Sequence, residues 1–124
     1  MVAFDVAVPR SRFGEFLDQA VQLVGKTMPE AVVYDFGHVG DGGVHLNVVV
    51  PPATSSQAIV ALRDSVYELT VNVFGGSFSA EHGIGPYNQR WYAKYTEPAM
   101  LELAAALHHH FDPSHCVGNV RLDN

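Results

Sequence analysis

The sequence predicts an α+β fold, with helices packed on one face of a mainly antiparallel sheet and further helices at the C-terminal end. One reason is the Asp41-Gly42 pair, which lies between two runs rich in β-branched residues and is a strong hairpin signal. The other is the order of periodicities along the chain, which reads strand, helix, strand, strand and helix before a glycine-rich loop. Such a sheet leaves one face without helices, and that face needs a cover or a partner.

The N-terminal part predicts a strand followed by a helix. Residues 4–8 alternate in polarity, and Pro9 ends the strand. Ser11 is the expected N-cap of the helix, and Glu15 lies near its positive end. The expected inward face of this helix consists of Phe13, Phe16, Leu17, Ala20, Leu23 and Val24.

The hairpin is expected from strands over residues 31–39 and 44–50. A two-residue turn at Asp41-Gly42 would place His38 opposite His45, with both imidazoles on the face that also carries Phe36 and Asn47. This register depends on the turn length, because a longer turn would pair different residues.

Three helices are expected in the remainder. Ser55 or Ser56 caps the first, which Gly75-Gly76 ends, and Pro86 precedes a short one over residues 88–94. Thr96 is the expected cap of the last helix, and residues 112–124 form a tail. The expected inward faces are Ile59, Leu62, Val66, Leu69 and Val73 in the first helix, and Met100, Leu103, Ala104, Leu107 and Phe111 in the last.

Composition excludes several classes of protein. The chain of 124 residues is 48% hydrophobic, which suits one domain over residues 1–124. Its net charge of −6, from 7 Lys+Arg and 13 Asp+Glu, argues against a nucleic-acid or anionic-membrane surface. We expect no transmembrane segment or signal peptide. The single cysteine, Cys116, reads as a structural thiol and favours a reducing, cytoplasmic location.

Four residues form a candidate metal and proton-transfer site. His38 and His45 could bind one divalent ion, Glu81 could complete a set of two histidines and one carboxylate, and His82 would then be free for acid–base work. Interpretations without a metal or catalytic role also stay open at this point. The histidines could be polar rim residues of the hairpin, Glu81 could pair with an arginine, and His82 could be a loop residue.

Two other patterns in the sequence are weak evidence for a functional site. The glycine-rich turn after Phe36 lacks the Lys-Ser/Thr of a phosphate loop, and no helix follows it directly. The run His108-His109-His110 lies at a helix end, where successive side chains point about 100° apart and polar groups suit the negative end of the dipole.

Two signatures in order resemble those of the FAD-linked oxidases, a family that includes D-lactate dehydrogenases, glycolate oxidase flavin subunits and D-2-hydroxyglutarate dehydrogenases. The first is the stretch from Gly37-His38 through His45-Leu46-Asn47, and the second is Glu81-His82-Gly83-Ile84-Gly85. The segments at Asp5-Val6-Ala7-Val8-Pro9 and Phe111-Asp112-Pro113 are similar as well. The resemblance implies a C-terminal, ferredoxin-like cap domain that lacks the flavin-binding domain and contacts it in the full-length protein.

The resemblance also implies roles. His38, His45 and Glu81 match metal ligands, for zinc or else manganese or iron. His82 matches the proton acceptor, Asn47 a substrate-binding amide, and Asn119 a weak flavin contact. The implied enzyme oxidises a small 2-hydroxyacid to the 2-oxoacid with metal-assisted proton abstraction and hydride transfer to FAD. The isolated chain is then expected to be inactive, and a homo-oligomer is allowed.

Three departures from the family pattern stand out. Gly43 replaces the usual Asn, the tail at Val117-Gly118-Asn119-Val120 replaces Leu-Asn-Pro-Gly-Lys, and residues 1–5 lack basic substrate-anchoring groups. Two alternatives to the flavoenzyme therefore remain in view. One is a stand-alone metal-dependent hydrolase, and the other is a non-catalytic α+β binding module.

Overall fold

The computed structural model describes residues 1–117 and divides the chain into two compact units, Met1–Glu81 and a second unit that begins at His82. Each unit is described by itself below. The expectation that the chain forms one domain stays a prediction.

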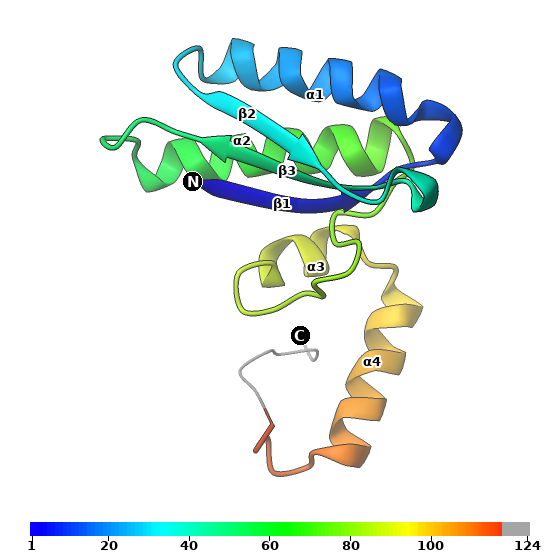
Figure 1. Ribbon diagram of the computed structural model, residues 1–124. Coiled ribbons are helices and arrows are strands. Elements are labelled where there is room, and N and C mark those ends of the chain that lie inside the picture. Colours follow the sequence, from blue (N-terminus) through cyan, green and yellow to red (C-terminus); the bar gives the residue numbers. More distant parts are fainter. Residues whose placement is uncertain (118–124) are drawn as a thin grey trace. The chain divides into compact units, whose positions relative to one another are not determined.

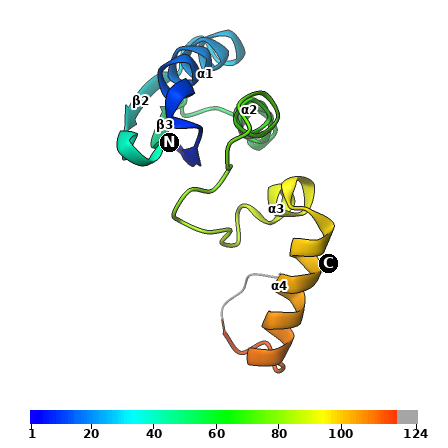
Figure 2. The ribbon, with the colours of Figure 1, turned by 90° about the vertical axis from the view of Figure 1, so that its right-hand side faces the viewer.

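The first unit is a two-layer α+β arrangement, which confirms the predicted fold class (Figure 1). Its antiparallel sheet has the strand order β1-β3-β2. Strand β3 is in the centre because it pairs with both β1 and β2. Figure 2 shows α1 and α2 together on one side of this sheet. The elements are β1 (Val2–Ala7), α1 (Phe13–Thr27), β2 (Val32–Phe36), β3 (Gly43–Val49) and α2 (Ser56–Glu68).

The core lies between the sheet and the two helices. Every second residue of β1 and β3 points into it, as the period of a half-buried strand requires. Aromatic rings meet edge to face, with Phe4 and Tyr67 at 5.5 Å and Phe16 and Phe74 at 5.3 Å between ring centroids. The buried apolar side chains of the sheet and helices are Val2, Phe4, Val6, Phe13, Phe16, Ala20, Val24, Val44, Leu46, Val48, Leu62, Val66 and Tyr67.

The turn of the hairpin is longer than the predicted two residues, so the predicted register was wrong. A 3-10 turn spans Val39–Asp41, and His38 exchanges backbone hydrogen bonds with Gly43 instead of facing His45. Phe36 is the partner of His45. The observed register differs from the predicted register by an even number of residues. The side chains of the two strands therefore lie on the faces of the sheet that the sequence predicts.

The two helices of this unit begin differently. Ser55 caps α2 as predicted, because its hydroxyl accepts a hydrogen bond from the Ala58 amide at 3.2 Å. Ser11 does not cap α1: it lies within a 3-10 turn over Arg10–Arg12, and no side chain caps that helix. The Arg12 guanidinium instead bonds both carboxylate oxygens of Glu15 at 3.1 Å, which lowers the pKa of Glu15.

A π-helical turn over Leu69–Val73 follows α2 directly and changes the predicted inward face. Its wider ring, closed by the Phe74 amide on the Leu69 carbonyl, inserts an extra residue into the helical repeat. Thr70 is therefore buried, whereas Val73, predicted inward, is exposed. Thr70 satisfies its hydroxyl by donating to the Val66 carbonyl at 2.8 Å.

The second unit contains α3 (Gln89–Tyr95) and α4 (Pro98–Phe111). The last helix begins at Pro98 after Glu97, so the predicted Thr96 cap was wrong. Its predicted inward face was wrong too, since Met100, Leu103, Leu107 and Phe111 are all at least half exposed. Amphipathic spacing predicts which residues share a face, but it does not supply a partner for that face. Within residues 1–117, no helix is long and apolar enough to cross a membrane.

Candidate metal site

A pocket of about 220 Å³ opens on the helix-free face of the sheet in the first unit. It is lined by parts of β1, the 3-10 turn, β3 and the segment that ends at Glu81. The lining residues are Asp5, Ala7, His38, Asp41, Gly43, Val44, His45, Ala80 and Glu81.

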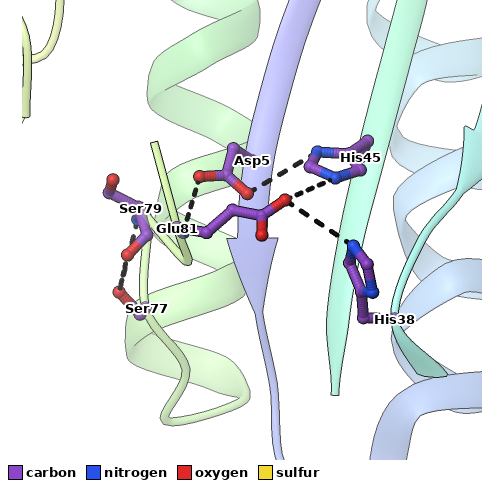
Figure 3. Close-up of polar contacts among 6 residues, drawn as sticks. All are labelled: Asp5, His38, His45, Ser77, Ser79 and Glu81. Atoms are coloured by element: carbon purple, nitrogen blue, oxygen red, sulfur yellow. Dashed lines mark hydrogen bonds and ion pairs between the residues drawn. The ribbon is translucent and has the colours of Figure 1, made fainter. Parts of the chain in front are cut away.

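The three predicted metal ligands converge in this pocket (Figure 3). The Glu81 Oε1 atom lies 2.9 Å from Nε2 of His45 and 3.8 Å from Nε2 of His38. The two imidazole rings are 5.9 Å apart between centroids. The structure therefore brings together residues 43 positions apart in the sequence, as the metal hypothesis requires, although the predicted pairing of the histidines was wrong.

Backbone contacts hold the turn that carries His38. The Val8 amide donates to the Gly42 carbonyl at 3.0 Å, which ties the turn to the end of β1. Gly42 has a φ of +82°, and a Cβ there would lie 2.1 Å from the Val8 carbonyl oxygen. This left-handed conformation and close approach require glycine.

Strand β1 also holds the segment that carries Glu81. Ala7 and Ser77 exchange backbone hydrogen bonds, and the Ala80 amide donates to the Asp5 carbonyl at 3.0 Å. Glu81 thus reaches the pocket from a chain segment fixed along the edge of the sheet, rather than from a free loop.

Asp5 is the pocket residue that sequence reasoning missed. Its Oδ1 atom lies 3.6 Å from Nδ1 of His45, and its Oδ2 accepts a hydrogen bond from the Glu81 amide at 2.9 Å (Figure 3). A signal was present, because Asp5 is the one charged residue in an otherwise apolar strand and occupies an outward position. The strand alone could not show which residues it would face.

The donor set fits a divalent transition metal. Asp5, His45 and Glu81 can each offer a ligand atom within 4.8 Å of the others, and His38 adds a second imidazole. Two imidazole nitrogens with one carboxylate suit zinc, and also iron or manganese, and leave coordination positions for other ligands. His45 is sheltered, with its side chain 15% exposed, whereas Glu81 and His38 are open to solvent.

The other predicted site residues have different outcomes. Asn47 lies on the same face of β3 as His45, two residues away, but it does not line the pocket. His82 is the first residue of the second unit, and its role stays a prediction. Asn119 lies outside the described residues. His108 pairs with Asp112 at 3.6 Å, while His110 contacts Phe111, so the histidine run does not converge on one point.

Gly43, where the family pattern usually has Asn, lies in the pocket wall. A Cβ built on it would lie 3.8 Å from the Cβ of His38, which is ordinary van der Waals contact. The backbone here would therefore accept a side chain, and the glycine is not required by the local packing.

The fold and the pocket define an α+β domain with a metal-type donor set on its open sheet face. Comparison with known proteins identifies the family: residues 1–119 match the model for FAD linked oxidases, C-terminal domain, and the chain belongs to this family.

Curated relatives agree with this assignment. The chain is 37% identical over 112 residues to a D-2-hydroxyglutarate dehydrogenase of Xanthomonas citri pv. viticola, covering 88% of this chain and 24% of that protein. It is 35% identical over 115 residues to a D-2-hydroxyglutarate dehydrogenase of Stutzerimonas stutzeri, covering 89% and 24%. It is 29% identical over 113 residues to a D-lactate dehydrogenase of Anaerostipes hadrus, covering 89% and 23%. The chain thus spans about a quarter of the length of these relatives.

Proposed function

We propose that this chain is the metal-holding, substrate-side part of an FAD-dependent dehydrogenase that oxidises a 2-hydroxyacid to the 2-oxoacid. The observation that carries the proposal is the convergence of His38 and His45 on one oxygen of Glu81. Family membership and relatives named as D-2-hydroxyglutarate and D-lactate dehydrogenases support the substrate class.

His38, His45 and Glu81 would hold the ion, each through one donor atom. A divalent cation at this position would lower the pKa of a bound substrate hydroxyl and orient the substrate through its carboxylate. Three protein ligands would leave the ion open to substrate, as in catalytic metal sites.

His82 is proposed as the group that accepts the hydroxyl proton, because it follows Glu81 directly and an imidazole nitrogen can act as a general base. Asn47 is proposed to donate an amide hydrogen bond to the substrate from the same sheet face as His45. A bound FAD would supply the hydride acceptor, and we propose that a separate domain of the full-length protein binds it.

The first experiment measures the metal content of the purified, untagged chain of 124 residues. We expect about one equivalent of zinc, manganese or iron, lost in His38→Ala and in Glu81→Ala because each variant removes one of three ligands. The matched control is His109→Ala, which removes an exposed histidine of α4 outside the pocket and should leave the content unchanged.

Substrate class is tested on the same samples. D-lactate and D-2-hydroxyglutarate should slow the loss of metal to a chelator, since a ligand that binds the loaded site stabilises it. Propanoate, which lacks the hydroxyl, should have little effect. Equal metal content in all variants, or no metal even with a 2-hydroxyacid added, would contradict the proposal. Hydrolytic activity of the loaded chain without flavin would favour the hydrolase alternative instead.

A further inference from the structure

The C-terminal end of α4 carries a second group of metal-ligating side chains, none of which lines the pocket described above. His108 is in the last turn of α4, Asp112 follows the helix directly, and His115 lies in the turn beyond it. Figure 1 shows the chain turning at this end of the helix. All three residues belong to the second unit.

Backbone hydrogen bonds fold the chain after α4 around Asp112. Its carbonyl accepts the His115 amide at 3.0 Å, and its carboxylate accepts the amides of Val117 at 2.9 Å and Cys116 at 2.7 Å. The amides of Val117 and Cys116 lower the pKa of Asp112, so its carboxylate is ionised at neutral pH. An ionised carboxylate offers about four acceptor positions, so a cation can share it with the two amides.

His108 and Asp112 form a sheltered pair at the helix end. Their side chains are 14% and 10% exposed, and Nε2 of His108 lies 3.6 Å from Oδ2 of Asp112. This distance is longer than a hydrogen bond. Two donor atoms bound to one tetrahedral ion at about 2.1 Å lie about 3.4 Å apart, so the pair has nearly the spacing of two ligands.

His115 supplies a second imidazole to this pair. Its ring centroid lies 5.0 Å from the ring centroid of His108. Two imidazoles bound to one zinc ion through bonds of about 2.0–2.1 Å have their centroids roughly 5 Å apart. His115 has a φ of +50° and its side chain is exposed, so its ring extends from a left-handed turn into solvent. A rotation about its side-chain bonds is needed to turn a nitrogen toward the other two donors.

We propose that His108, Asp112 and His115 bind a second divalent transition metal, of the class of zinc, at the C-terminal end of α4. Two imidazole nitrogens and one carboxylate oxygen are the donors, and water completes the coordination. The ion joins the last turn of α4 to the turn that follows it. Because His115 has to rotate, this site binds zinc more weakly than the pocket of the first unit, where the ligands already converge.

The test uses the chain of 124 residues with His38→Ala and Glu81→Ala together, which removes two ligands of the first site. Zinc is added to this double variant, and its affinity is measured by competition with a chromophoric chelator. We expect about one equivalent to bind, and the NMR signals of the His108 and His115 rings to shift in parallel with it.

Two further substitutions, each added to the double variant, test the ligands. His108→Ala and His115→Asn should each lower the zinc affinity at least about 10-fold, since losing a ligand costs no less than losing a residue that orients one. Asparagine tolerates the left-handed backbone at position 115, so this change removes the imidazole and keeps the turn. Circular dichroism confirms that each variant is folded.

The matched control is His109→Ala, which removes the same residue type from the next position of α4, where the side chain points about 100° away. It should leave the zinc affinity unchanged, and a loss equal to that of His108→Ala would overturn the proposal. Loss of zinc in Cys116→Ser without loss in His115→Asn would assign the ion to the thiol and overturn it too. A double variant that binds no zinc would leave His108 and Asp112 as an ordinary ion pair, whatever the outcome at the first site.

Discussion

Gly42 is the residue at which backbone conformation and site geometry depend on each other. In Gly42→Ala, the methyl group would meet the Val8 carbonyl oxygen at 2.1 Å, in addition to the cost of a left-handed conformation. We expect the free energy of unfolding to fall by about 2 kcal/mol or more. Zinc affinity should fall as well, because the turn carries His38. Chemical denaturation and the chelator competition measure the two effects.

Gly40→Ala is the control for this change. Gly40 lies in the same turn, its φ is not positive, and a Cβ there would have no neighbour within 4 Å. We expect its free energy of unfolding to stay within about 0.5 kcal/mol of the parent. Equal changes in the free energy of unfolding at positions 40 and 42 would show that the contact with β1 does not stabilise the turn.

The stability of the turn that follows Asp112 in the second unit depends on pH. The amides of Val117 and Cys116 donate to its carboxylate at 2.9 and 2.7 Å, and these hydrogen bonds lower its pKa below the ordinary 3.8. The ionised carboxylate therefore stabilises this turn above pH 3.8, and the stabilisation is lost as the pH falls through the lower folded pKa. The amide shifts of Cys116 and Val117 should titrate together with a midpoint below 3.8, and Asp112→Asn should abolish this titration. A midpoint at or above 3.8 would contradict the assignment.

Helix α2 depends on its cap at the scale of a whole element. Ser55→Ala removes the hydroxyl that accepts the Ala58 amide, and we expect it to lower the free energy of unfolding by about 1 kcal/mol. Ser56→Ala changes the same residue type one position later, inside the helix, where no cap bond is lost. It should have a smaller effect or a slightly stabilising one. Thermal denaturation measures both variants. A larger loss of stability for Ser56→Ala than for Ser55→Ala would contradict the assignment of Ser55 as the cap.

Element type and order could be predicted from the sequence, but two departures from local periodicity could not. The spacing of Ile59, Leu62 and Val66 predicts α2, but it does not predict the π-helical turn that buries Thr70. Asp41-Gly42 predicts a two-residue loop, while the observed turn is a 3-10 turn over Val39–Asp41, and the Gly42 that follows it accepts a hydrogen bond from the Val8 amide. The hairpin turn is tied to the end of β1 by a tertiary contact, which a local pattern does not contain.

The candidate site could be predicted in part for the same reason. His38, His45 and Glu81 were recognisable because their residue types suit a metal and their signatures are compact in sequence. Asp5 was not, because its partner Glu81 is 76 positions away and only the folded sheet brings them together. A lone charged residue in an apolar strand marks a position of interest, but the strand does not show which residues it will face.

The open face of the sheet affects the behaviour of the whole molecule in solution. Four apolar side chains of β2 and β3 on this face, Val32, Tyr34, Phe36 and Val49, are at least 42% exposed. Contiguous exposed apolar surface promotes association. We expect the chain to self-associate as its concentration rises, and Val32→Lys with Tyr34→Lys to suppress this in analytical ultracentrifugation.

Val21→Lys is the control for that prediction, because Val21 is a similarly exposed apolar residue on α1. A single exposed residue does not make a patch, so this change should leave self-association as it was. Equal suppression by both changes would mean that net charge, and not the sheet face, governs association.

The boundary between the two compact units falls on the peptide bond between Glu81 and His82. All the residues proposed to hold the ion in the pocket of the first unit precede that bond, and the residue proposed to accept the proton follows it. The last proposed ligand and the proposed base are therefore neighbours in the chain. A substitution at position 82 changes the proposed base without replacing any of the three proposed ligands of that ion, so metal content and proton transfer can be altered one at a time.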